Sequence, residues 1–286
     1  MKYRLGDIDW KEQSAEGEKL LRKADGAVLT SMQGGLEAEV QRVKLGDTEL
    51  VLKSWNRESR PDIPLQYKVL ERLYSQGCAV SNPYAWGVDA EGYHVLLMSY
   101  DGTPVRKVNA AGLAAIAHNL LNIHKLDLNT LDGVHVPSYE FIDYFFPEWG
   151  QQPEIRALAG KLIAQAEITP DRLIHGDYHL GNVLESAGQY TIIDWTNVQL
   201  GDPRYDIAWS ILLLRVYAGE RYAGIYQRAF LTSGSCTPAE LVLFEALASL
   251  RWLQLHRTTG VPLHRNTLTV MRALMQQNVF LPDGLL

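Results

Sequence analysis

The sequence predicts an α+β protein with two lobes, a small antiparallel sheet followed by a mainly helical part. Before about residue 100, short runs of β-branched and apolar residues alternate with glycine-containing turns. After residue 110, apolar residues recur at the spacing of amphipathic helices. The chain of 286 residues also exceeds the length at which one hydrophobic core usually stops growing. We therefore expect one lobe over residues 1–100 and a second over residues 101–286.

The first lobe holds the predicted strands. The charged stretch 11–23 predicts a helix ahead of them. Three antiparallel strands are then expected over residues 27–30, 38–43 and 49–53. The amphipathic pattern of residues 64–76, which ends at Gly77, predicts a second helix. Residues 93–98 are typical of a buried strand.

The second lobe is predicted to be helical. Its helices are expected over residues 110–124, 153–166, 211–219, 221–231, 238–256 and 267–278. His124 lies on or beside the apolar stripe of the first of these, which favours a core histidine over a catalytic one. Trp209, Trp252 and His256 are likewise expected to be core or half-buried residues. The aromatic run 139–146 suits either the core or the lining of a ligand site.

A polar loop with a distinctive spacing of side-chain oxygens lies between two short apolar runs. Asp177 precedes Asn182 by five residues, and Asp194 follows Asn182 by twelve. The turn at 185–188 and the β-branched run 190–193 predict a hairpin that brings Asn182 and Asp194 to the same end. Carboxylate and amide oxygens suit Mg²⁺, and phosphoryl transfer also needs a carboxylate beside the attacking hydroxyl. The pattern therefore favours metal-assisted phosphoryl transfer.

Three linked motifs resemble the aminoglycoside phosphotransferase and choline kinase family, which has a protein-kinase-like fold. The motifs are His175-Gly176-Asp177-Tyr178-His179-Leu180-Gly181-Asn182, Ile193-Asp194-Trp195 and Gly201-Asp202-Pro203-Arg204-Tyr205-Asp206-Ile207-Ala208. Weaker features extend the resemblance to about residues 25–210. It implies that Asp177 is the catalytic base, or orients the acceptor hydroxyl, and that Asn182 and Asp194 coordinate Mg²⁺. It also implies that His175 and Asp206 support the loop. Asp206 is equally suited to being an ordinary carboxylate at the N-terminus of the following helix, where the helix dipole favours a negative charge.

The resemblance implies a nucleotide site in the first lobe. Lys53, at a strand end, is implied to contact the α- and β-phosphates of ATP or GTP. Gly34 and Gly35 would let the backbone approach the phosphates. The hinge that receives adenine falls at Met98, Ser99 and Tyr100. Met98 is equally suited to filling the core.

The helix over residues 64–76 departs from the family pattern. The position where the family usually carries the glutamate partner of the strand lysine falls at Gln66. Glu71 is the one carboxylate within this helix, but it lies five residues on and faces elsewhere. We therefore expect either a hydrogen bond from Gln66 to Lys53 or, in a shifted register, pairing of Lys53 with Glu71.

The acceptor is implied to be a small molecule with a hydroxyl group. The family phosphorylates aminoglycosides and other antibiotics such as macrolides, and also choline, ethanolamine, homoserine and sugars. A cationic acceptor would need carboxylates, for which the candidates are Glu140, Asp143, Glu148 and Asp202, each also suited to being a solvated surface charge. The aromatic run 139–146 would alternatively hold a quaternary ammonium by cation–π contact.

Two other classes of protein remain open. A Ser/Thr protein kinase is disfavoured by Trp195 and by the six residues between Asp194 and Gly201, too few for an activation loop. A non-catalytic nucleotide-binding module is disfavoured because Lys53, Asp177, Asn182 and Asp194 are all present, although Gln66 favours it slightly.

Composition limits the classes of binding partner and the cellular location that we expect. The net charge of −6 argues against nucleic acid as the main partner. Cys78 and Cys236 lie far apart, without the spacing of a metal site or a disulfide framework. The N-terminus lacks the apolar region of a signal peptide, and the longest apolar run, 207–214, is too short to span a bilayer. We expect a cytoplasmic protein that does not bind membranes; the oligomeric state is not indicated.

Overall fold

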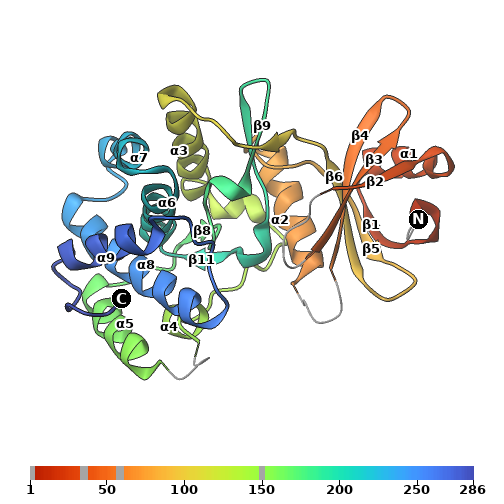
Figure 1. The fold of residues 1–286 in the computed structure, drawn as a ribbon. Coiled ribbons are helices and arrows are strands. Elements are labelled where there is room, and N and C mark those ends of the chain that lie inside the picture. The colour runs from red at the N-terminus through yellow and green to blue at the C-terminus, as the bar shows by residue number, and fades with distance from the viewer. Residues whose placement is uncertain (1–3, 33–37, 56–60, 148–151) are drawn as a thin grey trace. The chain divides into compact units, whose positions relative to one another are not determined.

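The computed structural model describes residues 4–32, 38–55, 61–147 and 152–286. The chain divides into two compact units, each built from three stretches (Figure 1). The first unit consists of Met1–Thr103, Asn129–His135 and Leu184–Thr196. The second unit consists of Pro104–Leu128, Val136–Val183 and Asn197–Leu286.

The first unit is built on a six-stranded sheet in which neighbouring strands are antiparallel. Its strands, in the order β1-β5-β6-β4-β3-β2, are β1 (Asp9–Gln13), β5 (Pro83–Val88), β6 (His94–Ser99), β4 (Thr48–Trp55), β3 (Ala38–Leu45) and β2 (Val28–Ser31). The helices are α1 (Ala15–Leu21), which packs on β5, and α2 (Ile63–Ser75), which packs on β5 and β6. Short 3₁₀ turns lie at Leu5–Asp7 and Ala24–Gly26.

The register of the sheet decides which side chains share a face. In β4, Lys53 lies opposite Val40 of β3 and Leu96 of β6, and Met98 is the partner of Val51. Because side chains alternate along a strand, Met98 and Lys53 lie on the same face of the sheet. The opposite face is apolar and belongs to a core cluster of Leu5, Ile8, Val43, Leu50, Leu52, Tyr84, Ala85, Val95 and Leu97.

The start of the chain differs from the prediction. The helix expected over residues 11–23 is wrong for its first turn, because Asp9–Gln13 forms β1 and pairs with β5. The helix begins after Ser14, whose hydroxyl oxygen accepts a hydrogen bond from the N–H of Gly17. Gly17 also allows close packing, since a Cβ there would lie 2.0 Å from the carbonyl oxygen of Tyr84.

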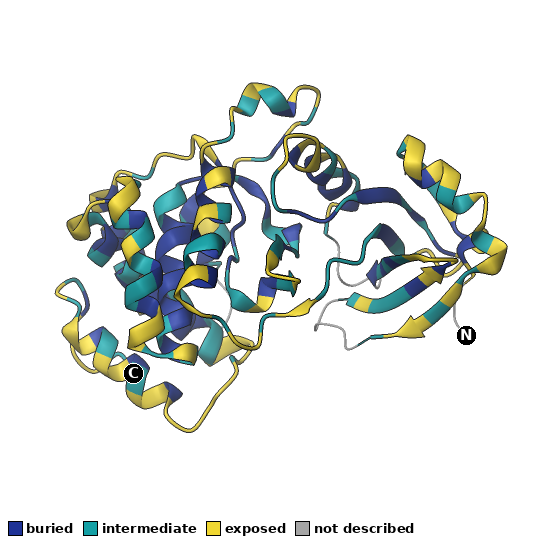
Figure 2. Ribbon diagram, turned by 90° about the horizontal axis from the view of Figure 1, so that it is seen from above, coloured by how far each residue is buried: buried dark blue, intermediate teal, exposed yellow. Residues whose placement is uncertain are grey.

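The second unit is mainly helical. Its helices are α3 (Ala110–His124), α4 (Phe141–Phe145), α5 (Pro153–Ala166), α6 (Pro203–Ala218), α7 (Glu220–Ser233), α8 (Pro238–Thr258) and α9 (Thr267–Gln277). A small antiparallel pair joins β8 (Arg172–Ile174) to β11 (Gln199–Gly201). α6 packs against α7, α8 and α9 and is buried along most of its length (Figure 2). It is therefore the central support of this unit.

The predicted hairpin is present. It consists of β9 (Val183–Ser186) and β10 (Gln189–Ile192), which are neighbours in their sheet. Ala187 and Gly188 at its tip both have positive φ, 50° and 81°, as a tight turn of the type I′ kind requires. The short strand β7 (Thr103–Pro104) and the 3₁₀ turns Leu128–Leu131, Leu180–Asn182 and Trp195–Asn197 complete the elements. Among the described residues, no helix is long and apolar enough to cross a membrane.

Candidate active site

The loop that carries Asp177 is anchored to α6. β8 ends at Ile174, and the next two backbone N–H groups both donate to the carboxylate of Asp206 in the first turns of α6. His175 N lies 2.7 Å from Oδ2, and Gly176 N lies 2.9 Å from Oδ1. His124 Nε2 lies 3.2 Å from the same Oδ2. Asp206 is fully buried, so these contacts replace the water that a buried carboxylate loses.

His175 and Gly176 shape the loop. The His175 side chain is buried; its Nδ1 accepts from the N–H of Asp177 at 3.3 Å, and its ring meets that of Tyr178 edge to face. Gly176 has a φ of +79°, and a Cβ there would lie 2.7 Å from the carbonyl oxygen of Asn197. A side chain at this position would therefore displace the loop from its anchor.

The Asp177 carboxylate has a nitrogen near each of its oxygens. Trp209 Nε1 of α6 donates to Oδ1 at 2.8 Å, and His179 Nε2 lies 3.6 Å from Oδ2. The side chain remains 38% exposed, so one edge is open to a ligand. Burial acts to raise the pKa of Asp177, but His179 and Trp209 more than offset it, and the pKa lies below its ordinary value. Asp177 is therefore ionised at neutral pH.

Asn182 closes the same loop. Its Nδ2 donates to the carbonyl oxygen of Asp177 at 2.9 Å, across the 3₁₀ turn Leu180–Asn182. This bond fixes the orientation of the amide, and Oδ1 makes no hydrogen bond to any residue in the described stretches. A free amide oxygen is a ligand that Mg²⁺ accepts. The donor set at Asn182 therefore fits a divalent cation.

In the first unit, Lys53 is paired with Asp194. Lys53 Nζ lies 2.9 Å from Asp194 Oδ1 and 5.1 Å from the centre of the Trp55 ring. Asp194 has a φ of +66°, a backbone conformation that is uncommon outside glycine and that clusters at functional sites. Its side chain is 38% exposed and offers carboxylate oxygens to a cation.

The predicted partners of Lys53 are placed differently. Within the described stretches, Lys53 forms its ion pair with Asp194, and neither a hydrogen bond nor an ion pair joins it to Gln66 or Glu71. Gln66 is 3% exposed, and its Nε2 has no hydrogen-bond partner among the described residues. Glu71 instead lies near enough to Tyr67 to contribute to the raised pKa of that phenol, whose main cause is burial.

The predicted hinge residues end β6. Met98 lies on the Lys53 face of the sheet, whereas the Ser99 hydroxyl accepts from Asn82 N at 2.8 Å and donates to Asp101 at 2.9 Å. The backbone N–H of Ser99 donates to Asn82 O, and that of Tyr100 to Glu49 O. The guanidinium of Arg42 lies over the Tyr100 ring, 4.3 Å from its centre. Gly34 and Gly35 lie outside the described residues.

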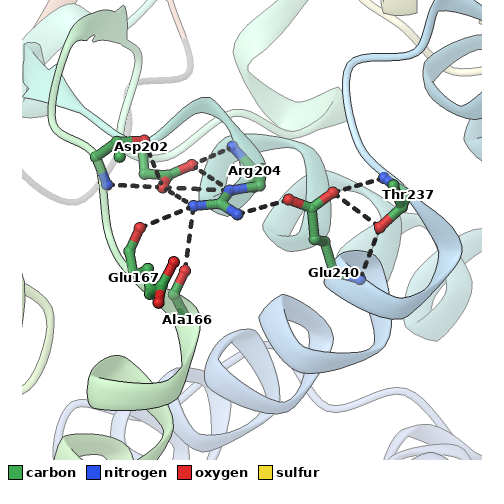
Figure 3. Close-up of polar contacts among 7 residues, drawn as sticks. Ala166, Glu167, Asp202, Arg204, Thr237 and Glu240 are labelled. Atoms are coloured by element: carbon green, nitrogen blue, oxygen red, sulfur yellow. Dashed lines mark hydrogen bonds and ion pairs between the residues drawn. The ribbon is translucent and has the colours of Figure 1, made fainter.

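Asp202 is a structural carboxylate, which corrects its assignment as an acceptor ligand or a solvated charge. It is fully buried, caps the N-terminus of α6, and accepts from Thr169 N at 3.0 Å. Arg204 reaches across it to Glu240 of α8 and to the carbonyl oxygens at the end of α5, Ala166 and Glu167 (Figure 3). The network ties the starts of α6 and α8 to the end of α5.

The other proposed acceptor groups lie partly in the core. Phe141, Phe145 and Phe146 are buried, whereas Tyr139 is 49% exposed and stacks on Tyr144 with ring centres 5.0 Å apart. The Tyr144 hydroxyl donates to Asn197 at 2.8 Å. Of the remaining candidate carboxylates, Asp143 pairs with Arg156 at 2.6 Å, Glu140 is exposed, and Glu148 lies outside the described residues.

The comparisons with known proteins decide the family. A model of the phosphotransferase enzyme family, APH, matches residues 28–253, which is most of the chain. The chain belongs to the phosphotransferase enzyme family. The resemblance inferred from the motifs and the enzyme class are thereby confirmed. None of the curated proteins matches the chain.

Solved structures share the fold of this phosphotransferase at low sequence identity. Amicoumacin kinase hAmiN in complex with AMP-PNP, Ca²⁺ and Ami is 13% identical, with a TM-score of 0.67 over 94% of this chain and 96% of that chain. A thermostable mutant of aminoglycoside phosphotransferase APH(4)-Ia, in a ternary complex with AMP-PNP and hygromycin B, is 15% identical, with a TM-score of 0.65 over 91% and 96%. Choline kinase LicA from Streptococcus pneumoniae is 14% identical, with a TM-score of 0.64 over 92% and 98%. The predicted protein-kinase-like α+β fold is confirmed.

For two residues beside Asp177 of the phosphotransferase, the sequence does not predict a role at the site. His179 lies inside the loop motif without an assigned role, and Trp209 is predicted simply as a core or half-buried residue. Trp209 follows Asp206 by three residues in α6, so both lie on the helix face turned to the loop. That spacing was the available signal, because Asp206 is already implied to support the loop.

Proposed function

We propose that this phosphotransferase transfers the γ-phosphoryl group of ATP or GTP to a hydroxyl group of a small molecule. The observation that carries the proposal is the held carboxylate of Asp177, ionised and open on one edge, in a loop anchored by Asp206. Phosphoryl transfer asks little covalent chemistry of a protein, so a rigidly placed carboxylate beside the hydroxyl suits it.

In the proposed reaction, the acceptor hydroxyl lies against Asp177. A bond forms between its oxygen and the γ-phosphorus, and the bond from that phosphorus to the β–γ bridging oxygen breaks. The bridging oxygen leaves on the nucleoside diphosphate, and the hydroxyl proton passes to Asp177 late in the transfer. The lowered pKa of Asp177 makes it a weak base, so its main contribution is to orient the hydroxyl.

We assign the nucleotide and metal groups as the family pattern places them. Residues 1–100 form the nucleotide lobe, and residues 101–286 supply the loop and the acceptor site. Asn182 and Asp194 would hold Mg²⁺, whose charge would neutralise the phosphate oxygens. Phosphate contacts are assigned to Lys53, Gly34 and Gly35, and adenine contacts to Met98, Ser99 and Tyr100. The solved complex of amicoumacin kinase with AMP-PNP and Ca²⁺ supports a nucleotide and a divalent cation.

The acceptor site we assign to the stacked pair Tyr139 and Tyr144. The exposed ring of Tyr139 offers a flat π-face, and Glu140 beside it carries an exposed carboxylate. Both suit a cationic group on the acceptor, such as an amino group of an antibiotic. An amino alcohol or a sugar is the alternative acceptor. The related solved complexes hold Ami or hygromycin B together with AMP-PNP, which supports a small-molecule acceptor.

A panel of acceptors tests the function. Mg²⁺-dependent release of ADP or GDP is measured with aminoglycosides, macrolides, amino alcohols, amino acids and sugars, for the wild type and for Asp177→Asn. Stimulation by one acceptor, lost in the variant, is the expected result. Tight nucleotide binding with no turnover on any acceptor would favour a binding module, and phosphorylation of a peptide array would favour a protein kinase.

A further inference from the structure

We propose that Trp209 and His179 are positioning residues, which together hold the Asp177 carboxylate in a single orientation for transfer. This inference rests on the proposed function of Asp177. It adds two residues to the site from outside the metal and nucleotide contacts, and it assigns Gly181 as the position that makes room for one of them.

Trp209 fixes one carboxylate oxygen. The indole N–H is purely a donor, and its nitrogen lies 2.8 Å from Asp177 Oδ1, a short and well-formed hydrogen bond to a charged group. The ring itself is 4% exposed and stacks on Tyr205, with ring centres 6.4 Å apart. Because the indole is locked by packing, the position of its N–H is set by the core and not by solvent.

The tautomer of His179 decides what it presents to the other oxygen. The backbone N–H of Gly181 donates to His179 Nδ1 at 3.0 Å, so Nδ1 is the acceptor nitrogen of the ring. The ring proton is then on Nε2, which lies 3.6 Å from Asp177 Oδ2. At this distance the ring N–H attracts the carboxylate electrostatically without a full hydrogen bond. Each oxygen of Asp177 is therefore met by an N–H group.

Gly181 leaves the space that the His179 ring occupies. A Cβ at residue 181 would lie 2.6 Å from Cε1 and 2.8 Å from Nδ1 of His179, closer than real Cβ contacts. Any side chain here would push the ring away from Asp177. The glycine is not required by a positive φ, so its role is the close approach of the ring.

The arrangement also links the loop to one helix face. Asp206 binds the backbone of residues 175 and 176, and Trp209, one turn later in α6, binds the side chain of residue 177. Backbone and carboxylate are thus set by the same helix. A loss of Trp209 should leave the backbone anchored while the carboxylate turns freely, which affects transfer and not nucleotide binding.

The proposal is tested by ATP turnover. The acceptor is water or the molecule that the panel identifies. Trp209→Phe keeps an aromatic ring, although a smaller one, and removes the N–H. We expect kcat to fall roughly 10-fold to 100-fold, the value of one hydrogen bond to a charged group, with the KM for ATP within about twofold. His179→Leu and Gly181→Ala should also lower kcat, but by less, because the 3.6 Å contact of His179 is weaker than a full hydrogen bond. His179→Gln, which can place a donor near the Nε2 position, should restore part of the loss.

The matched controls are Trp252→Phe and Gly160→Ala. Trp252 donates its indole N–H to Tyr217 at 3.2 Å, away from the loop, and a Cβ at Gly160 meets no atom within 4 Å. Neither should change kcat. An unchanged kcat in Trp209→Phe, or equal losses in Trp209→Phe and Trp252→Phe, would overturn the proposal.

A measurement without turnover separates this inference from the proposed function. In ¹⁵N-tryptophan-labelled protein, Trp209→Phe identifies one of the seven indole resonances. We expect Asp177→Ala to shift that resonance more than the other six, and the His179 ring to show its proton on Nε2. An indole resonance that does not shift in Asp177→Ala would refute the positioning of Asp177 by Trp209, even in an active enzyme. A shifted resonance in a protein with no turnover would refute the proposed function but support the positioning of Asp177 by Trp209.

Discussion

Asp177 is the single side chain on which turnover should depend most. It is ionised, open on one edge, and held through both its side chain and its carbonyl oxygen. We predict that Asp177→Asn lowers kcat roughly 10²-fold to 10⁴-fold, the usual span for a positioned acid–base group. The amide keeps the shape but loses the negative charge that faces the hydroxyl. Mg²⁺-dependent ADP release measures the effect, and near-wild-type turnover would remove Asp177 from its assigned role.

Asp194 should matter for binding as well as for rate. We predict that Asp194→Ala abolishes the use of Mg²⁺-ATP, because it deletes the carboxylate that we propose as a ligand to the metal. Isothermal titration calorimetry with Mg²⁺-ATP gives the affinity, and ADP release gives the rate. Asp132→Ala, at an exposed residue of the same unit, is the control. Affinity and rate that both match the wild type would refute the metal assignment.

At the scale of elements, Arg204 connects three helices. Its guanidinium is 17% exposed and pairs with the fully buried Asp202 at 2.6 Å, with Glu240 at 2.7 Å, and with the carbonyl end of α5. Removing it leaves Asp202 without its counter-charge. We predict that Arg204→Ala lowers the free energy of unfolding by roughly 3 kcal/mol, measured by urea denaturation.

A matched surface pair serves as the control. Glu18 in α1 and Arg22 at its C-terminal cap are an exposed pair four residues apart, at 2.6 Å. Arg22→Ala should change the free energy of unfolding by less than about 0.5 kcal/mol. Equal effects of the two substitutions would mean that the Arg204 network does not stabilise the junction of α5, α6 and α8.

The start of α8 should make stability depend on pH. Glu240 accepts from the backbone N–H and the hydroxyl of Thr237 in a capping box, and also from Arg204, so its pKa lies below its ordinary value. Folding then favours the ionised form, and this stabilisation is present above the unfolded-state pKa and lost as pH falls through the folded-state pKa.

We therefore predict that Glu240→Gln is less stable than the wild type at neutral pH. The difference should shrink as pH falls below the ordinary glutamate pKa of about 4.3 and through the lower value of the folded protein. Urea midpoints measured for both proteins at several pH values check this. A difference that stays constant with pH would show that the carboxylate charge does not contribute.

Periodicity predicts most of the long helices well because their own residues decide them, although α6 (Pro203–Ala218) begins eight residues before the helix predicted over 211–219. The helix predicted over 153–166 coincides with α5 (Pro153–Ala166), which starts with a proline at its first position and carries a regular apolar face. The strand β1 is missed because Asp9–Gln13 is charged and becomes a strand by pairing with β5. β11 is missed for a similar reason, since its three residues pair with β8.

For the whole molecule, the motifs predict the family and the fold, while contacts between distant residues lie beyond them. The H-G-D loop, the hairpin and the G-D-P segment are local in sequence, and each forms as a local structure. The ion pair of Lys53 and Asp194 spans 141 residues, and the bond from Trp209 to Asp177 spans 32. Neither contact produces a periodic pattern of residues in the sequence. Asp202 shows the reverse error, since a carboxylate that looks solvated in the sequence is fully buried.

With the phosphate and metal roles that we propose for Lys53 and Asp194, their pairing predicts that nucleotide and cation bind cooperatively. A cation at Asp194 competes with the lysine for the same oxygen, and phosphates that draw Lys53 away would release that oxygen. Each ligand should then raise the affinity for the other by the same factor, as thermodynamic linkage demands. Lys53→Ala should weaken this coupling while increasing the affinity for the cation alone. Titrations of Mg²⁺ with and without ADP, in both proteins, would measure how the ion pair suppresses metal binding until a nucleotide arrives.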